Sequence, residues 1–102
     1  MNDADRSLEE ILAAERKVER LSSKIAKGDV LRIMLRKNEK GSSGILMLLP
    51  NSEILRHTHV NDWEEYTFTD GHVEICSVGN SHELKNKTGE LLIVHFEKHR
   101  VL

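Results

Sequence analysis

Four side chains in the second half of the chain could together bind a divalent metal ion. His57 and His59 are two residues apart, so on a β-strand they point to the same side, together with Leu55. Glu64 follows five residues later, and His82 lies further along the chain. Imidazole and carboxylate groups bind Fe²⁺, Mn²⁺, Ni²⁺ and Zn²⁺, and the ion's charge would offset the cost of burying the carboxylate. The alternative is a hydrogen-bonded His–Glu cluster that stabilises the core without a metal.

The direction of the Glu64 side chain follows from a predicted hairpin. Asp70 and Gly71 suit a two-residue type I′ turn, which places Glu64 directly opposite Ser77 on the same face of the sheet. This face is mostly apolar and holds Glu64, Tyr66, Phe68, Val73 and Ile75. The other face is mostly polar and holds Glu65, Thr67, Thr69, His72, Glu74 and Cys76. We therefore expect Glu64 to point inward, and we expect three residues to line the pocket beside it: Tyr66, Phe68 and Ser77.

The spacing of these residues resembles the two motifs of the cupin family. The segment 57–71 has the pattern of the first motif, namely HxH, four residues, Glu, six residues and Gly. The segment 79–86 has the GxxHxxxN pattern that ends the second motif. The resemblance implies a small double-stranded β-helix, or jelly-roll barrel, in which one metal ion is bound by His57, His59, Glu64 and His82. Because Gly71 ends the first motif and also starts the second, we expect a barrel that is short at one end.

The resemblance also implies a range of activities. These are dioxygenation, isomerisation or epimerisation, and decarboxylation of small hydroxy or keto acids and sugars. No residue stands out as a catalytic base, so the catalytic residues stay undefined. We expect a small metal-dependent enzyme that acts on an organic acid or a sugar with Fe, Mn, Ni or Zn as its cofactor. The alternative is a non-catalytic module that senses a metal or a ligand and docks on a partner through an N-terminal helix.

The elements that position the four side chains are expected to be β-strands. Seven short β-compatible segments alternate with turn residues, which predicts an all-β sandwich or barrel. The segments are 30–36, 45–49, 54–59, 64–69, 72–77, a short piece around 82–84, and 91–98. The polar segment 38–44 contains two glycines and is expected to connect the first two strands.

The segment 7–27 has the pattern of an amphipathic α-helix. Ser7 and Glu10 have the spacing of a capping box, and Gly28 is placed to end the helix. One apolar stripe is formed by Ile11, Ala14, Val18, Leu21 and Ile25. We therefore expect an N-terminal helix at 1–28 and a cupin-like β-barrel domain at 29–102. The stripe and the exposed strand edges of so small a barrel also predict a homodimer.

The composition excludes several classes of protein. The 102 residues include 15 Lys and Arg against 17 Asp and Glu, and this balance leaves no strongly basic surface for nucleic acid. No apolar run reaches the length of about 18 residues that a membrane span needs, and the acidic start is not a secretory signal. The single cysteine, Cys76, excludes zinc sites built on paired thiolates. We expect a soluble cytoplasmic protein that binds a small molecule, with His72, His95 and His99 outside the site.

Overall fold

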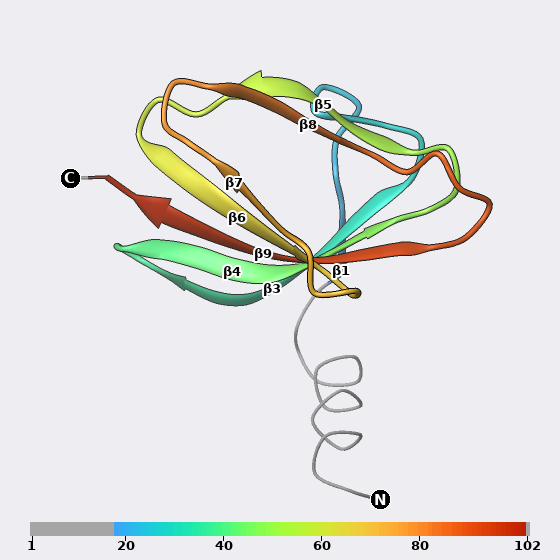
Figure 1. Ribbon diagram of the computed structural model, residues 1–102, viewed down its shortest axis with the longest axis horizontal. Coiled ribbons are helices and arrows are strands. Elements are labelled where there is room, and N and C mark those ends of the chain that lie inside the picture. Colours follow the sequence, from blue (N-terminus) through green and yellow to red (C-terminus); the bar gives the residue numbers. More distant parts are fainter. Residues whose placement is uncertain (1–17, 102) are drawn as a thin grey trace, which may run out of the picture.

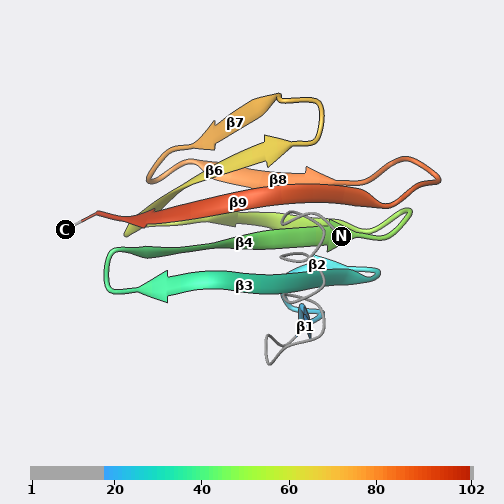
Figure 2. The same cartoon turned by 90° about the horizontal axis from the view of Figure 1, so that it is seen from below.

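The computed structural model describes residues 18–101, which form nine strands in two antiparallel sheets (Figure 1). The strands are β1 (Val18–Arg20), β2 (Ala26–Lys27), β3 (Val30–Asn38), β4 (Gly41–Leu48), β5 (Glu53–Thr58), β6 (Asp62–Phe68), β7 (Val73–Cys76), β8 (Ser81–Lys85) and β9 (Leu92–Arg100). The larger sheet has the order β1-β3-β4-β9-β6-β7, and the smaller sheet has the order β2-β5-β8. Figure 2 shows the strands of the larger sheet side by side in this order.

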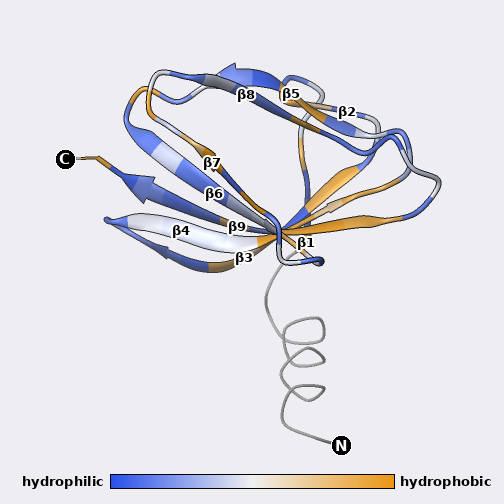
Figure 3. Cartoon of the chain, viewed as in Figure 1, coloured by the Kyte–Doolittle hydropathy of each residue, from blue (hydrophilic) through white to orange (hydrophobic). Residues whose placement is uncertain are grey.

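The two sheets face each other across an apolar core. The core side chains come from both sheets: Ala26, Val30, Leu46, Leu48, Ile54, Tyr66, Leu84, Val94 and Phe96. Alternate residues of β4 and β9 point into this core, as the period of a strand requires. Among residues 18–101 no strand pairing joins the two sheets, so the predicted closed barrel is instead an open jelly-roll sandwich. Figure 3 shows hydrophobic residues gathered at one end of the sandwich and hydrophilic residues at the other end, beside the C-terminus.

All seven predicted strands are confirmed, as β3 to β9. The predicted connection at 38–44 is wrong, because β4 begins at Gly41 and only two residues, Glu39 and Lys40, lie between β3 and β4. A Cβ atom on Gly44 would lie 2.2 Å from the main-chain oxygen of Ile33. Glycine at this position thus marks the close approach of two strands rather than a loop.

The α-helix predicted at 7–27 is wrong in the part that the structure describes. β1 pairs with β3 of the larger sheet, and β2 pairs with β5 of the smaller sheet, so strands before Gly28 pair with strands after it in both sheets. Helix-favouring residues take these extended positions because pairing and burial outweigh local propensity: Ala26 is 4% exposed in the core. Residues 7–17 of the predicted helix lie outside the described residues. Within residues 18–101 no helix has the length and apolar character needed to cross a bilayer.

The hairpin between β6 and β7 has a three-residue loop instead of the predicted two-residue turn. The main-chain N–H of Gly71 donates to the carbonyl of Phe68 at 2.9 Å, and Gly71 has a φ of 91°. A β-turn followed by a left-handed glycine is the usual form of such a loop. The extra loop residue shifts the pairing by one position, so Glu64 lies opposite Cys76 and not opposite Ser77.

This shift inverts the predicted faces of β7 but leaves those of β6 unchanged. Glu64 is 5% exposed and Tyr66 is 2% exposed, as expected for the inner face. Val73 and Ile75, which were predicted to point inward, are 47% and 63% exposed. Cys76, which was predicted on the polar face, packs against the core instead.

The inward position of Cys76 lowers the reactivity of its thiol. Burial raises the pKa of this thiol from 9.0 to about 11, and the negative charges of Glu64 and Glu74 add to the rise. The thiolate is the reactive form, and a rise of about two pH units lowers its fraction about 100-fold at neutral pH. We expect iodoacetamide to label Cys76 about 100-fold more slowly in the native protein than in the urea-unfolded protein at pH 7.5, followed by mass spectrometry. Equal labelling rates would contradict this placement.

Candidate metal centre

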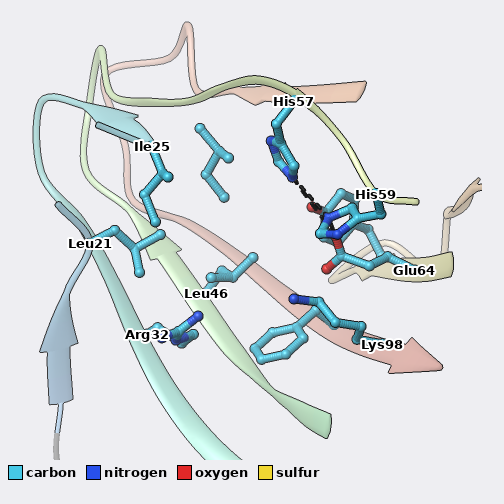
Figure 4. Close-up of a pocket in the computed structure, with 11 residues that line it drawn as sticks. Leu21, Ile25, Arg32, Leu46, His57, His59, Glu64 and Lys98 are labelled. Carbon is cyan, nitrogen blue, oxygen red and sulfur yellow. Dashed lines mark hydrogen bonds and ion pairs between the residues drawn. The ribbon is translucent and has the colours of Figure 1, made fainter. Parts of the chain in front are cut away.

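Three neighbouring segments bring the four predicted ligands together. His57 lies on β5 and His59 directly after it, Glu64 lies on β6, and His82 lies on β8. His57 and His82 are direct partners in the pairing of β5 with β8. The four ligand atoms all lie within 4.8 Å of one another, and Figure 4 shows His57, His59 and Glu64 pointing toward one another at the wall of a cavity. These residues therefore form a His₃Glu cluster that could hold a metal ion.

The distances between the donor atoms suit a single divalent ion. Oε1 of Glu64 lies 2.7 Å from Nε2 of His59 and 3.1 Å from Nε2 of His82. Nε2 of His57 lies 3.0 Å from Nε2 of His59 and 4.0 Å from Oε1 of Glu64. An ion with ligand bonds of about 2.1 Å holds neighbouring donors about 3.0 Å apart and opposite donors about 4.2 Å apart in an octahedral arrangement. Imidazole and carboxylate donors at these separations fit Fe²⁺, Mn²⁺, Ni²⁺ or Zn²⁺.

A β-bulge in β5 aims His57 at the cluster. Ile54 pairs with Leu84, and His57 pairs with His82, so three steps along β5 match two steps along β8. The bulge allows Ile54 and His57 to point inward together, and both line the cavity. Leu55, which was predicted to share the face of His57, instead lines a hollow beside Ala26 and Lys27.

The same bulge fixes the ring of His57. Nδ1 of His57 lies 2.7 Å from the main-chain oxygen of Leu55, and this oxygen can only accept, so Nδ1 carries the proton and donates. The neutral ring then presents the lone pair of Nε2 to the other members of the cluster. This is the form in which imidazole binds a metal ion, and a carbonyl partner of this kind fixes the orientation of the ring.

The cluster is largely removed from water. The side chains of Glu64 and His82 are 7% and 9% exposed, whereas that of His57 is 31% exposed. Burial lowers the pKa of His82 from its ordinary value of 6.5, and repulsion from His57 lowers it further, while Glu64 acts in the opposite direction. His82 is therefore neutral at pH 7, as a metal ligand must be. Burial also raises the pKa of Tyr66, so its hydroxyl group stays protonated.

The lowered pKa of His82 predicts that the metal-free protein loses stability in mild acid. Above a pH of about 6.5 this residue is neutral in both the folded and the unfolded state. As the pH falls below that value the unfolded chain binds the proton first, so the free energy of unfolding decreases until the lower folded pKa is reached. We expect the melting temperature of EDTA-treated protein to fall between pH 7 and pH 5, and the variant His82→Gln to show a weaker fall. A melting temperature that stays constant or rises over this range would contradict the prediction.

The cluster forms part of the wall of a cavity of about 280 Å³. Its lining residues are Leu21, Ile25, Arg32, Leu46, Ile54, His57, His59, Glu64, Tyr66, Phe96 and Lys98. Of the three residues predicted to line a pocket, Tyr66 lies in this wall. Phe68 packs against the core, and Ser77 is exposed because of the shifted register.

Arg32 and Lys98, the cationic residues of the cavity wall among residues 18–101, were not predicted to line a pocket. Lys98 follows Val94 and Phe96 at alternate positions of β9, and both of these are buried in the core. Alternation along the strand is therefore the signal that could have placed Lys98 on the inner face. The remaining histidines lie on other elements, with His72 at the β6–β7 hairpin and His95 and His99 on β9.

Known structures share this arrangement of strands. A protein from Thermotoga maritima, described as a predicted oxalate decarboxylase, has a TM-score of 0.77 and 22% identity over 86% of this chain and 96% of its own. The cupin domain of Cnp3 from Schizosaccharomyces pombe has a TM-score of 0.66 and 14% identity over 70% of this chain and 61% of its own. This chain has the cupin fold. A double-stranded β-helix protein from Klebsiella pneumoniae, with a TM-score of 0.62 and 16% identity over 80% of this chain and 78% of its own, has the same fold.

The cupin fold confirms the resemblance seen in the two sequence motifs. The four motif positions His57, His59, Glu64 and His82 form the His₃Glu cluster inside the sandwich. No protein-family model matches the chain, and no curated protein matches it. The identities of 14–22% to these structures establish the fold alone, so a function has to be argued from the site.

Proposed function

We propose that this protein binds one divalent metal ion through His57, His59, Glu64 and His82 and acts on a small organic acid or sugar in the adjoining cavity. The observation that carries the proposal is the convergence of four donor atoms within 4.8 Å at the wall of a cavity of about 280 Å³. A site of this kind, concave and mostly apolar with a few convergent polar groups, is typical of small-molecule binding.

The residues of the site would have different roles in binding the ion and the ligand. Glu64, buried between His59 and His82, supplies a negative charge for the ion, and the carbonyl of Leu55 holds His57 in the ligating form. When bound, a divalent ion supplies Lewis acidity that polarises an oxygen atom of the ligand. The apolar side chains of the wall lower the amount of water around that oxygen, which strengthens electrostatic interactions within the cavity.

Metal-dependent turnover is the test of this function. Protein loaded with Fe²⁺, Mn²⁺, Ni²⁺ or Zn²⁺ and protein stripped with EDTA are incubated with a mixture of hydroxy acids, keto acids and sugars, and the mixture is followed by proton NMR. The proposal covers dioxygenation, isomerisation and decarboxylation, and the likeness to a protein described as a predicted oxalate decarboxylase supports including the last of these. We expect one compound to be consumed only by the metal-loaded protein.

The second candidate is a module that binds a metal or a ligand without turnover. The open sandwich favours it, because catalysis usually needs walls that exclude water. A compound that raises the melting temperature of the metal-loaded protein but is never consumed would support this candidate. A protein that takes up none of the four metals would contradict the first candidate and the metal-binding form of the second, and the His–Glu cluster would then be a hydrogen-bonded part of the core.

A further inference from the structure

We propose that the cavity binds a small organic acid anion with a short apolar body, and that Lys98 and Arg32 hold its carboxylate. This inference rests on the proposed function and chooses between the two substrate classes named there. The charge of the wall, the unpaired donors of the two cations and the apolar character of the remaining wall carry it.

Lys98 brings a positive charge to the cavity without a protein carboxylate to neutralise it. Lys98 and Glu64 are direct partners in the pairing of β9 with β6, so their Cα atoms lie about 5 Å apart. The ammonium group nevertheless forms no ion pair with Glu64, and no other carboxylate within residues 18–101 lies within 4.0 Å of it. Figure 4 shows the side chain of Lys98 directed into the cavity. An anion in the cavity would supply the missing partner.

Arg32 contributes a second cation and an unused hydrogen-bond donor. One terminal nitrogen, Nη2, donates to Oε2 of Glu19 at 2.7 Å. Nε of Arg32 is buried and has no hydrogen-bond acceptor among the residues that the structure describes. A buried donor without a partner is costly, and a guanidinium group binds carboxylates through charge-assisted hydrogen bonds. Arg32 lines the cavity, and Glu19 occupies only one of its terminal nitrogens, so the guanidinium keeps N–H groups for a carboxylate bound there.

The balance of charge in the cavity wall favours an anion over a neutral ligand. Among residues 18–101, Glu64 is the acidic residue that lines the cavity, and Arg32 and Lys98 are the basic ones. Glu19, outside the lining, pairs with Arg32 and offsets its charge. A divalent ion at the cluster would more than neutralise Glu64, and Lys98 would add a further positive charge, so the wall would be positive even with Arg32 paired to Glu19. The attraction between a positive wall and an anion is stronger in an apolar cavity than it is in bulk water, because the dielectric constant is lower.

The apolar part of the wall indicates the character of the part of the ligand that lies beyond its carboxylate. Five lining residues are hydrocarbon in character: Leu21, Ile25, Leu46, Ile54 and Phe96. The hydroxyl groups of a sugar would lose their water against this surface and find few partners. A cavity of about 280 Å³ is at the small end of ligand pockets. A short aliphatic carboxylate satisfies both the size and the apolar surface.

Calorimetric titration with three small probes tests the inference. The protein is loaded with Zn²⁺, its metal content is measured by elemental analysis, and it is titrated with butanoate, with the neutral analogue butanamide and with glucose. We expect butanoate to bind at least about tenfold more tightly than butanamide, as loss of a charge-assisted contact implies. Glucose should bind more weakly than either. Butanamide binding as tightly as butanoate, or glucose binding more tightly, would overturn the inference without the need for any variant.

Variants of the two cations test whether Lys98 and Arg32, or the metal ion alone, bind the carboxylate. Lys98→Met and Arg32→Met should each weaken butanoate binding about tenfold, while the control Lys87→Met, in the exposed loop before β9, should leave it unchanged. Unchanged binding in both cavity variants would show that the ion alone holds butanoate and would overturn the inference. The metal analysis keeps the two proposals distinct: protein without bound Zn²⁺ contradicts the proposed function, and its titration with butanoate still tests Lys98 and Arg32.

Discussion

Replacing His59 with alanine should lower the affinity for Zn²⁺ by more than the 10–100-fold loss that is typical of residues that only orient a ligand. His59 lies at the middle of the cluster, since its Nε2 is 3.0 Å from Nε2 of His57 and 2.7 Å from Oε1 of Glu64. Its loss removes one donor and leaves the carboxylate of Glu64 with fewer partners in a buried place. Competition with a chromophoric zinc chelator at pH 7.5 measures the change.

The matched control for this variant is His72→Ala. The side chain of His72 is 59% exposed at the β6–β7 hairpin, so its loss should leave the zinc affinity unchanged. Zinc should also raise the melting temperature of the wild-type protein and of His72→Ala but not that of His59→Ala, because only a ligand that binds the folded state stabilises it. If His59→Ala keeps the wild-type affinity, the cluster is a hydrogen-bonded part of the core and the metal proposal fails.

Replacing Asn86 with aspartate should destabilise the fold by about 3–5 kcal/mol at pH 7, which is the usual cost of an unpaired buried charge. Asn86 is 3% exposed. Its Nδ2 donates to the carbonyl oxygens of Leu48 at 2.8 Å, Leu49 at 3.2 Å and Glu90 at 2.7 Å. A carboxylate oxygen in place of Nδ2 would face these three acceptors with no proton to share. Urea unfolding followed by circular dichroism measures the free energy of unfolding.

A second asparagine provides the control for that variant. Asn80 is exposed in the loop between β7 and β8, and Asn80→Asp should change the free energy of unfolding by less than about 0.5 kcal/mol. The deficit of Asn86→Asp should also shrink in acid, because a protonated carboxyl group can again donate one hydrogen bond. Equal losses for the two variants would contradict the role assigned to the Asn86 amide.

Much of the sandwich and of the cluster could be predicted because both follow from local patterns. Alternation and turn residues predicted the strands β3 to β9. The HxH spacing predicted that His57 and His59 point to the same side, and alternation with Tyr66 predicted that Glu64 points inward; the structure brings His82 to these three donors. The homodimer and the N-terminal segment before residue 18 stay predictions.

The errors arose where two conformations suit one sequence. Gly71 is compatible with both a two-residue turn and a three-residue loop. The observed three-residue loop shifts the register by one residue, so every side chain of β7 lies on the face opposite to the predicted one. The bulge at Leu55 has no glycine to mark it, since it depends on the pairing of β5 with β8. Residues 18–27 have a helical pattern but contain the strands β1 and β2, because these pair with β3 and β5, which come from later parts of the chain.

The ligands of the cluster come from both sheets, and this has a mechanical consequence. His57 and His82 belong to the smaller sheet, and Glu64 belongs to the larger one. Within residues 18–101 no strand pairing connects the two sheets, so a chelated ion would cross-link them. Amide hydrogen exchange in β5 and β8 should then slow when zinc is added, and the rest of the larger sheet should respond less.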